Sequence, residues 1–465
     1  MTGHLSVSRR LASLVVIACL ATVIAVSGKA QTCPNPPPVD ISSPAIPSDV
    51  CIPNGFAGNP IQFFDDFSWR SFVAVVWPAL NGQRGQPDTA QKVSGSGPRV
   101  FETYKMLHEV FHNDGSAPTT WNNYDSPDFN ACSVQMKFGD VVLASFSKFS
   151  NLGQAGFGSL VGPLVAQNTT YVRYETAFNE SEFTQIAGPQ WYLRAKLPPT
   201  ITFNNGSIDI KSAWIDMTGM PHPERYYTRQ AWLLNPETGT CAPTSVGLVG
   251  LHIVQKTPTR PQWIWTTFEQ VDNVPPPQPG APGTFGFNDG TKTPMPPTNP
   301  YSIDPLPLPT PPAFNVTRTL PVNPSTVNTN SGYRKALAGT PWQFYQLTMT
   351  QWPIKPSSPS TPGTPNNTFP GTSPTSAFAN TTLETFDQGR IQTGCMNCHN
   401  LTMGPTDFLW SLKDHAFPPT TPALLLRDPE FKQLQQLLRA NPHTAAAAAQ
   451  QRAIEARKPK TKTND

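Results

Sequence analysis

The stretch that decides the fold is VGLVGLHIVQK, at residues 246–256. It is rich in Val, Leu and Ile, which are typical of a buried β-strand. Two runs of similar character flank it, RYYTRQAWLL at 225–234 and QWIWTTFEQV at 262–271. The linking segments, NPETG at 235–239 and TPTRP at 257–261, contain turn-forming residues. The three runs therefore predict an antiparallel meander at the centre of the chain.

Segments on either side of the meander predict further strands and several helices. Alternation of apolar and polar residues predicts strands at 134–138, 171–175 and 208–215. Helical spacing or a long apolar run predicts helices at residues 63–77, 100–112, 180–187, 333–349 and 429–440. The 54 prolines and only 14% charged residues indicate many loops. We expect an α+β fold: a β-rich antiparallel body with flanking helices, long Pro-rich loops and a small helical segment near the C-terminus.

The N-terminus has the features of a secretory signal peptide. Arg9 and Arg10 precede an apolar run at 11–26, and small residues at 27–30 offer a cleavage site. An uncleaved anchor is the alternative, although 16 apolar residues are short for a membrane span. Cleavage would remove three of the 33 basic residues and none of the 30 acidic ones, which leaves no net charge. We therefore expect a periplasmic or secreted protein with no nucleic-acid partner, and membrane contact only if the segment stays uncleaved.

The motif with the most specific chemistry is GCMNCH, at residues 394–399. Two cysteines separated by two residues and followed by histidine suit covalent haem attachment. The two thiols add to the two porphyrin vinyl groups, and the adjacent imidazole ligates the iron. A thioredoxin-like redox pair would sit near a βαβ pattern, and a structural zinc site would need a second pair of ligands. A plain disulfide with a coincidental histidine is the remaining alternative. The motif predicts one covalent haem c.

The arrangement around this motif resembles a small monohaem cytochrome c domain. A helical stretch, the motif, a loop and a terminal helix follow one another within residues 377–440. The resemblance implies that Cys395 and Cys398 form the thioethers and that His399 is the proximal iron ligand. The larger region, with RPQWIW at 260–265, resembles uncharacterised bacterial secreted proteins that end in such a motif.

The sixth iron ligand does not follow the usual cytochrome pattern. No methionine follows Met403, which is too close to His399 to reach the opposite side of the ring. His415 lies 16 residues beyond His399 and is the first candidate, because a loop of that length spans the distance easily. His252 and Met349 are candidates if the domains pack together. The other possibility is a five-coordinate iron, as in haem enzymes and gas sensors.

Composition divides the chain into six parts. They are a signal peptide (1–30), an α+β body (31–274), a Pro-rich excursion or linker (275–332), a helix with a Pro/Thr/Ser tether (333–376), the haem segment (377–440) and a flexible basic tail (441–465). Outside the signal peptide and the haem motif, four cysteines remain, and they allow two disulfides in three connectivities. We expect Cys33 to pair with Cys51 by proximity and Cys132 with Cys241 by elimination.

A second metal-binding motif competes with the haem motif. His108, Glu109 and His112 form His-Glu-x-x-His, in which two histidines bind zinc and the glutamate acts as general base. The third ligand of the protease family with this spacing would fall at Pro118, which cannot ligate a metal. A solvated helix face is the simpler interpretation, haem ligation by either histidine another, and Glu175, Glu180 and Glu182 are conceivable third zinc ligands.

Three functions follow from these motifs. The first is an exported haem protein that exchanges electrons with a redox partner protein or with a small-molecule donor or acceptor. The second is a haem oxidoreductase or gas sensor with an open iron position. The third is a zinc hydrolase that uses the motif at 108–112.

Overall fold

The computed structural model describes residue 1 and residues 32–112, 114–125, 135–143, 164–234, 241–275, 285–291, 313, 315–353, 368–369, 379–385, 388, 394–399 and 406–418. The expected signal peptide, most of both Pro-rich segments, the helix at 429–440 and the basic tail lie outside these residues. Among the helices that are described, none is long and apolar enough to cross a membrane.

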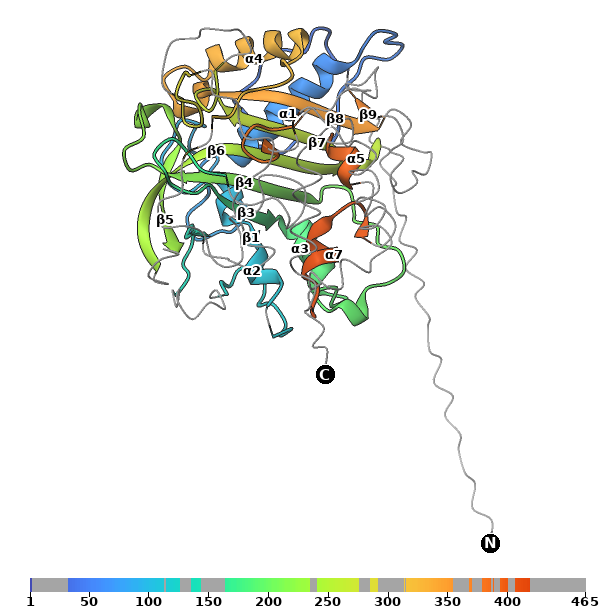
Figure 1. The fold of residues 1–465 in the computed structure, drawn as a ribbon. Coiled ribbons are helices and arrows are strands. Elements are labelled where there is room, and N and C mark those ends of the chain that lie inside the picture. The colour runs from blue at the N-terminus through green and yellow to red at the C-terminus, as the bar shows by residue number, and fades with distance from the viewer. Residues whose placement is uncertain are drawn as a thin grey trace, which may run out of the picture.

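A curved mixed sheet forms the body of the molecule (Figure 1). Its main path runs in the order β1-β3-β4-β6-β7-β8-β9, and β5 pairs with both β6 and β2. The strands are β1 (Lys105–Met106), β2 (Val142–Leu143), β3 (Arg173–Phe178), β4 (Ile208–Asp216), β5 (Thr228–Leu234), β6 (Cys241–Thr257), β7 (Arg260–Gln270), β8 (Tyr345–Pro353) and β9 (Thr368–Phe369). The expected α+β class with a β-rich body is confirmed. The pairing of β5 with β6 and of β6 with β7 is antiparallel, so the predicted meander is confirmed too.

The helices are short and lie on the two sides of the sheet. They are α1 (Ile61–Val75), α2 (Leu107–Val110), α3 (Glu180–Ala187), α4 (Pro324–Ala336), α5 (Cys395–His399) and α7 (Trp410–His415), with short 3-10 turns between them such as η1 (Val100–Thr103) and η5 (Pro341–Phe344). The predictions of α1 and α3 are confirmed. At the start of α3 the Asn179 side chain accepts a hydrogen bond from the Glu182 N–H, which satisfies one of the unpaired amides of the first turn.

Two predicted helices are wrong. Residues 100–112 form η1, then β1, then the single turn α2, because the backbone between the two turns extends to pair with β3. Residues 333–349 end α4 and then begin β8, because Gly339 takes a left-handed φ of 83° and Pro341 interrupts the helix. The predicted strand at 134–138 is also wrong at its described residues, 135–138, which are irregular. In the first two cases pairing with the sheet decides the conformation of a segment whose own pattern is ambiguous.

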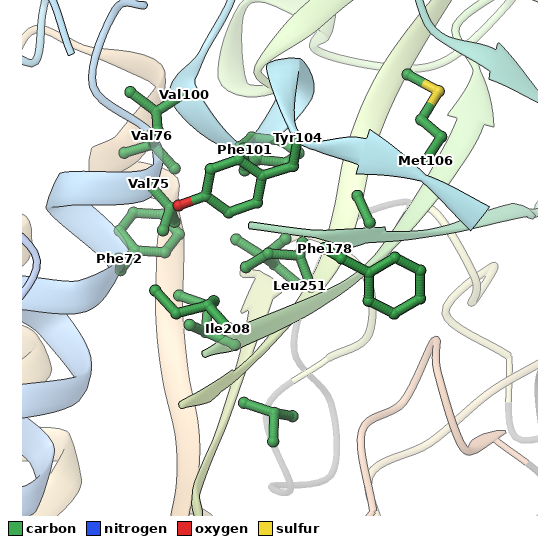
Figure 2. Packing of buried hydrophobic residues seen from close by; sticks show 14 of the residues in the cluster. Phe72, Val75, Val76, Val100, Phe101, Tyr104, Met106, Phe178, Ile208 and Leu251 are labelled. Carbon is green, nitrogen blue, oxygen red and sulfur yellow. The ribbon is translucent and has the colours of Figure 1, made fainter. Parts of the chain in front are cut away.

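Helix α1 covers one face of the sheet. The Ser68 hydroxyl hydrogen-bonds the hydroxyls of Thr266 and Thr350, both at 2.8 Å, and the rings of Phe72 and Phe268 stack with centroids 4.3 Å apart. Figure 2 shows Phe72 of α1 packed beside η1 and facing Leu251 of the sheet. This face therefore holds one part of the main apolar core, which continues onto the opposite face at Trp265 and Met396.

The opposite face of the central strands is covered by residues 379–385, 394–399 and 406–418. Because side chains alternate along a strand, Gly250, His252 and Val254 of β6 lie on the face opposite to Leu251. Asn380 Nδ2 donates to Thr267 Oγ1 at 2.8 Å on the same face. The C-terminal residues thus pack directly on the sheet, with Met396 fully buried in the main core.

One expected disulfide is confirmed. Cys33 and Cys51 are joined, with their Cα atoms 5.4 Å apart. Structural disulfides persist in oxidising compartments, so this bond is compatible with export. The second expected pair includes Cys132, which lies outside the described residues, and that pairing stays a prediction.

Candidate functional site: the Cys395–His399 segment on the sheet

The haem motif lies on α5, which packs against β8 and β7. Gln351 of β8 anchors its first turn, because its side-chain oxygen accepts a hydrogen bond from the Met396 N–H at 3.2 Å. A Cβ atom on Gly394 would lie 2.6 Å from the Gln351 side-chain nitrogen, so a larger residue here would have to displace the end of the Gln351 side chain. The segment is therefore held close to the sheet from its first residue. Figure 1 shows α5 beside β7 and β8, and α7 beside α3.

The imidazole of His399 is fixed by two contacts. Its Nδ1 lies 2.7 Å from the Phe408 carbonyl oxygen, and because a carbonyl only accepts, Nδ1 carries the hydrogen. Its ring also packs on Trp265 of β7, with centroids 4.3 Å apart. Metal-bound histidines commonly donate their second ring N–H to a backbone carbonyl, which sets the tautomer and the ring orientation. In this tautomer Nε2 is the atom that would ligate iron.

The Phe408 carbonyl is itself held by an unusual backbone. Asp407 and Phe408 both have left-handed φ values, 50° and 74°. The Asp407 carboxylate accepts a hydrogen bond from the Phe203 N–H at 2.8 Å and forms a buried ion pair with Lys256, while the Trp263 indole donates to the Asp407 carbonyl at 2.9 Å. Left-handed residues of this type persist only where their surroundings enforce them. The contacts of Asp407 thus determine where the acceptor for His399 lies.

Burial controls the ionisation of the motif residues. Desolvation lowers the pKa of His399 to about 4, with the Phe408 hydrogen bond opposing it and the positive charges of Lys211 and His252 adding to it. Desolvation, reinforced by the negative charge of Glu384, raises the pKa of the Cys395 thiol. The imidazole is therefore neutral, as a metal ligand must be. A raised thiol pKa is the opposite of what a redox-active cysteine pair shows.

An ionisable group of side chains lies next to His399. His252 of β6 pairs in register with Lys211 of β4, and its Nε2 is 3.5 Å from Glu384 Oε2. Burial alone would raise the pKa of Glu384, but the charges of His252 and Lys211 and the Asn380 N–H outweigh it and lower the pKa. Both His252 and Glu384 act on the ionisation of His399. The structure therefore brings His252 and His399 to one face of the sheet.

The other predicted haem residues lie in different surroundings. The side chain of Cys398 lies outside the described part of the chain, so its thioether stays a prediction. His415 ends α7, and its ring centroid is 5.9 Å from that of Phe111. Met349 is buried in β8 opposite Thr267. His415 as the sixth ligand stays a prediction.

The motif at 108–112 has a structural role. Helix α2 ends at Val110, before His112, so the two histidines do not lie one helical turn apart. Both carboxylate oxygens of Glu109 accept from the Arg84 guanidinium, at 2.8 and 3.0 Å, and the pair is buried. A carboxylate occupied in this way is not available as a general base. Among the described residues, no group of three His, Cys, Asp or Glu side chains is placed to hold a metal ion.

Several residues of the site carry no sequence signal. Glu384, Lys211, Gln351 and the Phe408 carbonyl come from four separate segments, and none belongs to a recognisable motif. Trp265 belongs to the run RPQWIW at 260–265, whose composition is unusual. Such residues become visible only once the C-terminal segment is seen on the sheet.

Comparisons with known proteins found no relative of this chain. No protein-family model, curated protein or solved structure matches the chain. The site's chemistry must therefore be argued from its own residues.

Proposed function

We propose that this chain is an exported protein that carries one covalent haem and transfers electrons. Cys395 and Cys398 hold the haem as thioethers and His399 is the proximal iron ligand. The observation that carries the proposal is the hydrogen bond from His399 Nδ1 to the Phe408 carbonyl, which presents a neutral imidazole through its other nitrogen. When bound, the haem supplies a one-electron couple at the iron.

The chain's own residues support this role by what they bind and exclude. The His399 ring packs on Trp265 and Met396 is fully buried, and exclusion of water is one of the factors that set the redox potential in haem and iron–sulfur proteins. The partner, a redox protein or a small-molecule donor or acceptor, would exchange electrons with the haem edge. Export is supported by the N-terminal sequence pattern and by the Cys33–Cys51 disulfide.

The experiment is expression of the full chain in two hosts, with and without the machinery that attaches c-type haem. We expect haem that stays on the polypeptide after denaturation, only in the first host, and an N-terminus that begins near residue 31. The matched variant Cys395→Ser should lose at least one thioether, which changes the denatured haem spectrum. A chain without bound haem from the competent host would contradict the proposal.

The second candidate uses the same haem as the centre of an enzyme or gas sensor. The observation that favours it is the ionisable group of Lys211, His252 and Glu384 beside His399, since such side chains move protons in catalysis. It requires an open position on the iron. Carbon monoxide binding to the reduced protein tests it: a shifted spectrum supports the enzyme or sensor, and an unmoved spectrum supports the electron carrier.

A further inference from the structure

The sheet places His252 beside the proximal histidine. Val254 of β6 lies directly opposite Trp265 of β7, and His252 lies opposite Thr267, two residues along. His252 and Met349, which both lie opposite Thr267, are therefore diagonal neighbours of Trp265 on one face, and such pairs have Cα atoms about 7–8 Å apart. The His399 ring packs on Trp265 at 4.3 Å. An iron bound to His399 would thus lie within reach of the His252 imidazole.

The Nε2 atom of His252 faces a carboxylate. It is buried and lies 3.5 Å from Glu384 Oε2, an ion-pair distance at which no hydrogen bond is formed by strict geometry. Iron ligation by this nitrogen would therefore replace its contact with Glu384.

The rival histidine lies much further away across the sheet. The ring of His415 packs on Phe111, and Phe111 packs on Phe178 of β3 with centroids 6.1 Å apart. Phe178, Asp209, Val254 and Trp265 form one continuous row across β3, β4, β6 and β7. Three strand spacings separate the ends of that row, about 14 Å at ~4.8 Å each. The row separates Phe178 from Trp265 by more than the diagonal spacing between His252 and Trp265, so His252 is the nearer candidate by its place on the sheet.

We propose, on the basis of the haem function above, that His252 is the second axial ligand of the haem iron. Glu384, which faces the same ring nitrogen, would lose that contact when the iron binds and would remain a negative charge beside the site. The sheet supplies one ligand and the haem motif the other, so haem binding fastens residues 394–399 to β6. A six-coordinate iron of this kind suits electron transfer and leaves no open position for a substrate.

The test is spectroscopic and uses the full chain matured with haem. Magnetic circular dichroism and electron paramagnetic resonance of the oxidised wild-type protein should show a low-spin iron with two imidazole ligands. The change His252→Ala should convert it to a high-spin form that binds carbon monoxide when reduced, and added imidazole should restore the low-spin spectrum. His415→Ala is the matched control and should leave the spectrum unchanged.

The outcomes separate this inference from the proposed function. Absence of covalent haem in the wild-type protein overturns the proposed function itself. Covalent haem that is high-spin in the wild type, or has a sulfur ligand that Met349→Leu removes, overturns the assignment of His252 but not haem binding. A low-spin spectrum that survives His252→Ala and is lost in His415→Ala also overturns it. If His252→Ala does not fold, His252→Met decides: replacement of the two-imidazole spectrum by one with a sulfur ligand supports the assignment, and an unchanged two-imidazole spectrum overturns it.

Glu384→Gln adds a readout for the negative charge beside His252. The amide keeps the size of the side chain and removes its charge. We expect the spectrum to stay low-spin with a raised mid-point potential, because a nearby negative charge stabilises the oxidised iron. An unchanged potential would mean that Glu384 does not act on the ligand or the iron.

Discussion

At the scale of single residues, the site depends on how Asp407 and Phe408 are held. Their left-handed backbone points the Phe408 carbonyl at His399, and the Asp407 carboxylate is bound to Lys256 inside the protein. A change at Asp407 would therefore affect both the ion pair and the orientation of the proximal imidazole. The same reasoning assigns Glu109 and Arg84 to structure rather than to zinc chemistry, because their charges neutralise each other in the core.

Removing the Asp407 carboxylate should be strongly destabilising. Asp407→Ala leaves the Lys256 ammonium buried without its partner, which costs about 3–5 kcal/mol in comparable cases. The matched control is Asp40→Ala at the partly exposed Arg70 pair, where about 1 kcal/mol or less is expected. Urea unfolding of both variants measures the difference. Equal losses of unfolding free energy would contradict the view that the buried pair holds the Phe408 turn.

Asp65, a buried carboxyl on α1, makes the free energy of unfolding depend on pH. Burial raises the pKa of Asp65 from 3.8 to about 7, against the hydrogen bonds that it accepts from Thr326 and Thr350. The folded state thus holds a proton that the unfolded chain releases near pH 4, and stability falls as pH rises from about 4 to 7. The slope from one such group is about 1.4 kcal/mol per pH unit.

The change Asp65→Asn tests this effect, because the amide cannot ionise. Unfolding free energies at pH 5, 6, 7 and 8 should fall less steeply in the variant than in the wild-type protein. Other buried carboxyls, among them Glu175 with a pKa raised to about 8, remain as a shared background in both proteins. Identical slopes would show that Asp65 is already ionised when buried, and the assigned pKa would be wrong.

At the scale of elements, packing on the sheet decided what the sequence left open. The meander, α1 and α3 could be predicted because their apolar patterns and caps are local. Residues 345–349 alternate apolar and polar side chains, which is a strand signal, but they follow directly on the helical stretch that begins at 333 and are therefore predicted as its continuation. The haem motif was readable from its spacing, whereas His252, Glu384 and Phe408 form one site through pairings between distant segments. No local pattern records those pairings.

The contact between α1 and the sheet should dominate the stability of the body. Phe72 is fully buried and stacks on Phe268, so Phe72→Ala should cost about 3–5 kcal/mol through lost burial and the cavity left behind. Val327 on α4 is 49% exposed, and Val327→Ala should change the unfolding free energy by less than about 0.5 kcal/mol. Denaturant titrations compare the two variants. A small loss at Phe72 would mean that α1 is not part of the cooperative core.

At the scale of the whole molecule, the sheet lies between α1 on one face and the haem segment on the other. Met396, Phe408 and Leu412 of the haem segment are buried in the same core as Phe72. The described parts of residues 377–440 are thus joined to the body by a continuous apolar cluster. We expect haem loss to loosen this segment while α1 and the meander stay folded, since only the segment depends on the haem bond.

The N-terminal disulfide should stabilise the whole assembly. The loop between Cys33 and Cys51 contacts two elements of the body. Asp40 pairs with Arg70 of α1, and the Pro47 carbonyl accepts a hydrogen bond from Gln255 of β6. A closed loop of this length restricts the unfolded chain by about 3 kcal/mol. The double variant Cys33→Ser/Cys51→Ser should therefore unfold at a lower temperature in calorimetry, and a reductant should have the same effect on the wild type. An unchanged transition would mean that this segment detaches before the body unfolds.

The central claim is that His399 and its two cysteines hold a covalent haem. The most direct measurement is the intact mass and absorption spectrum of the denatured chain, purified from a host that attaches c-type haem. The account predicts a polypeptide heavier by one haem, with the haem spectrum still on the chain, and neither feature in the double variant Cys395→Ser/Cys398→Ser. A wild-type chain of unmodified mass, with no haem after denaturation, would contradict it.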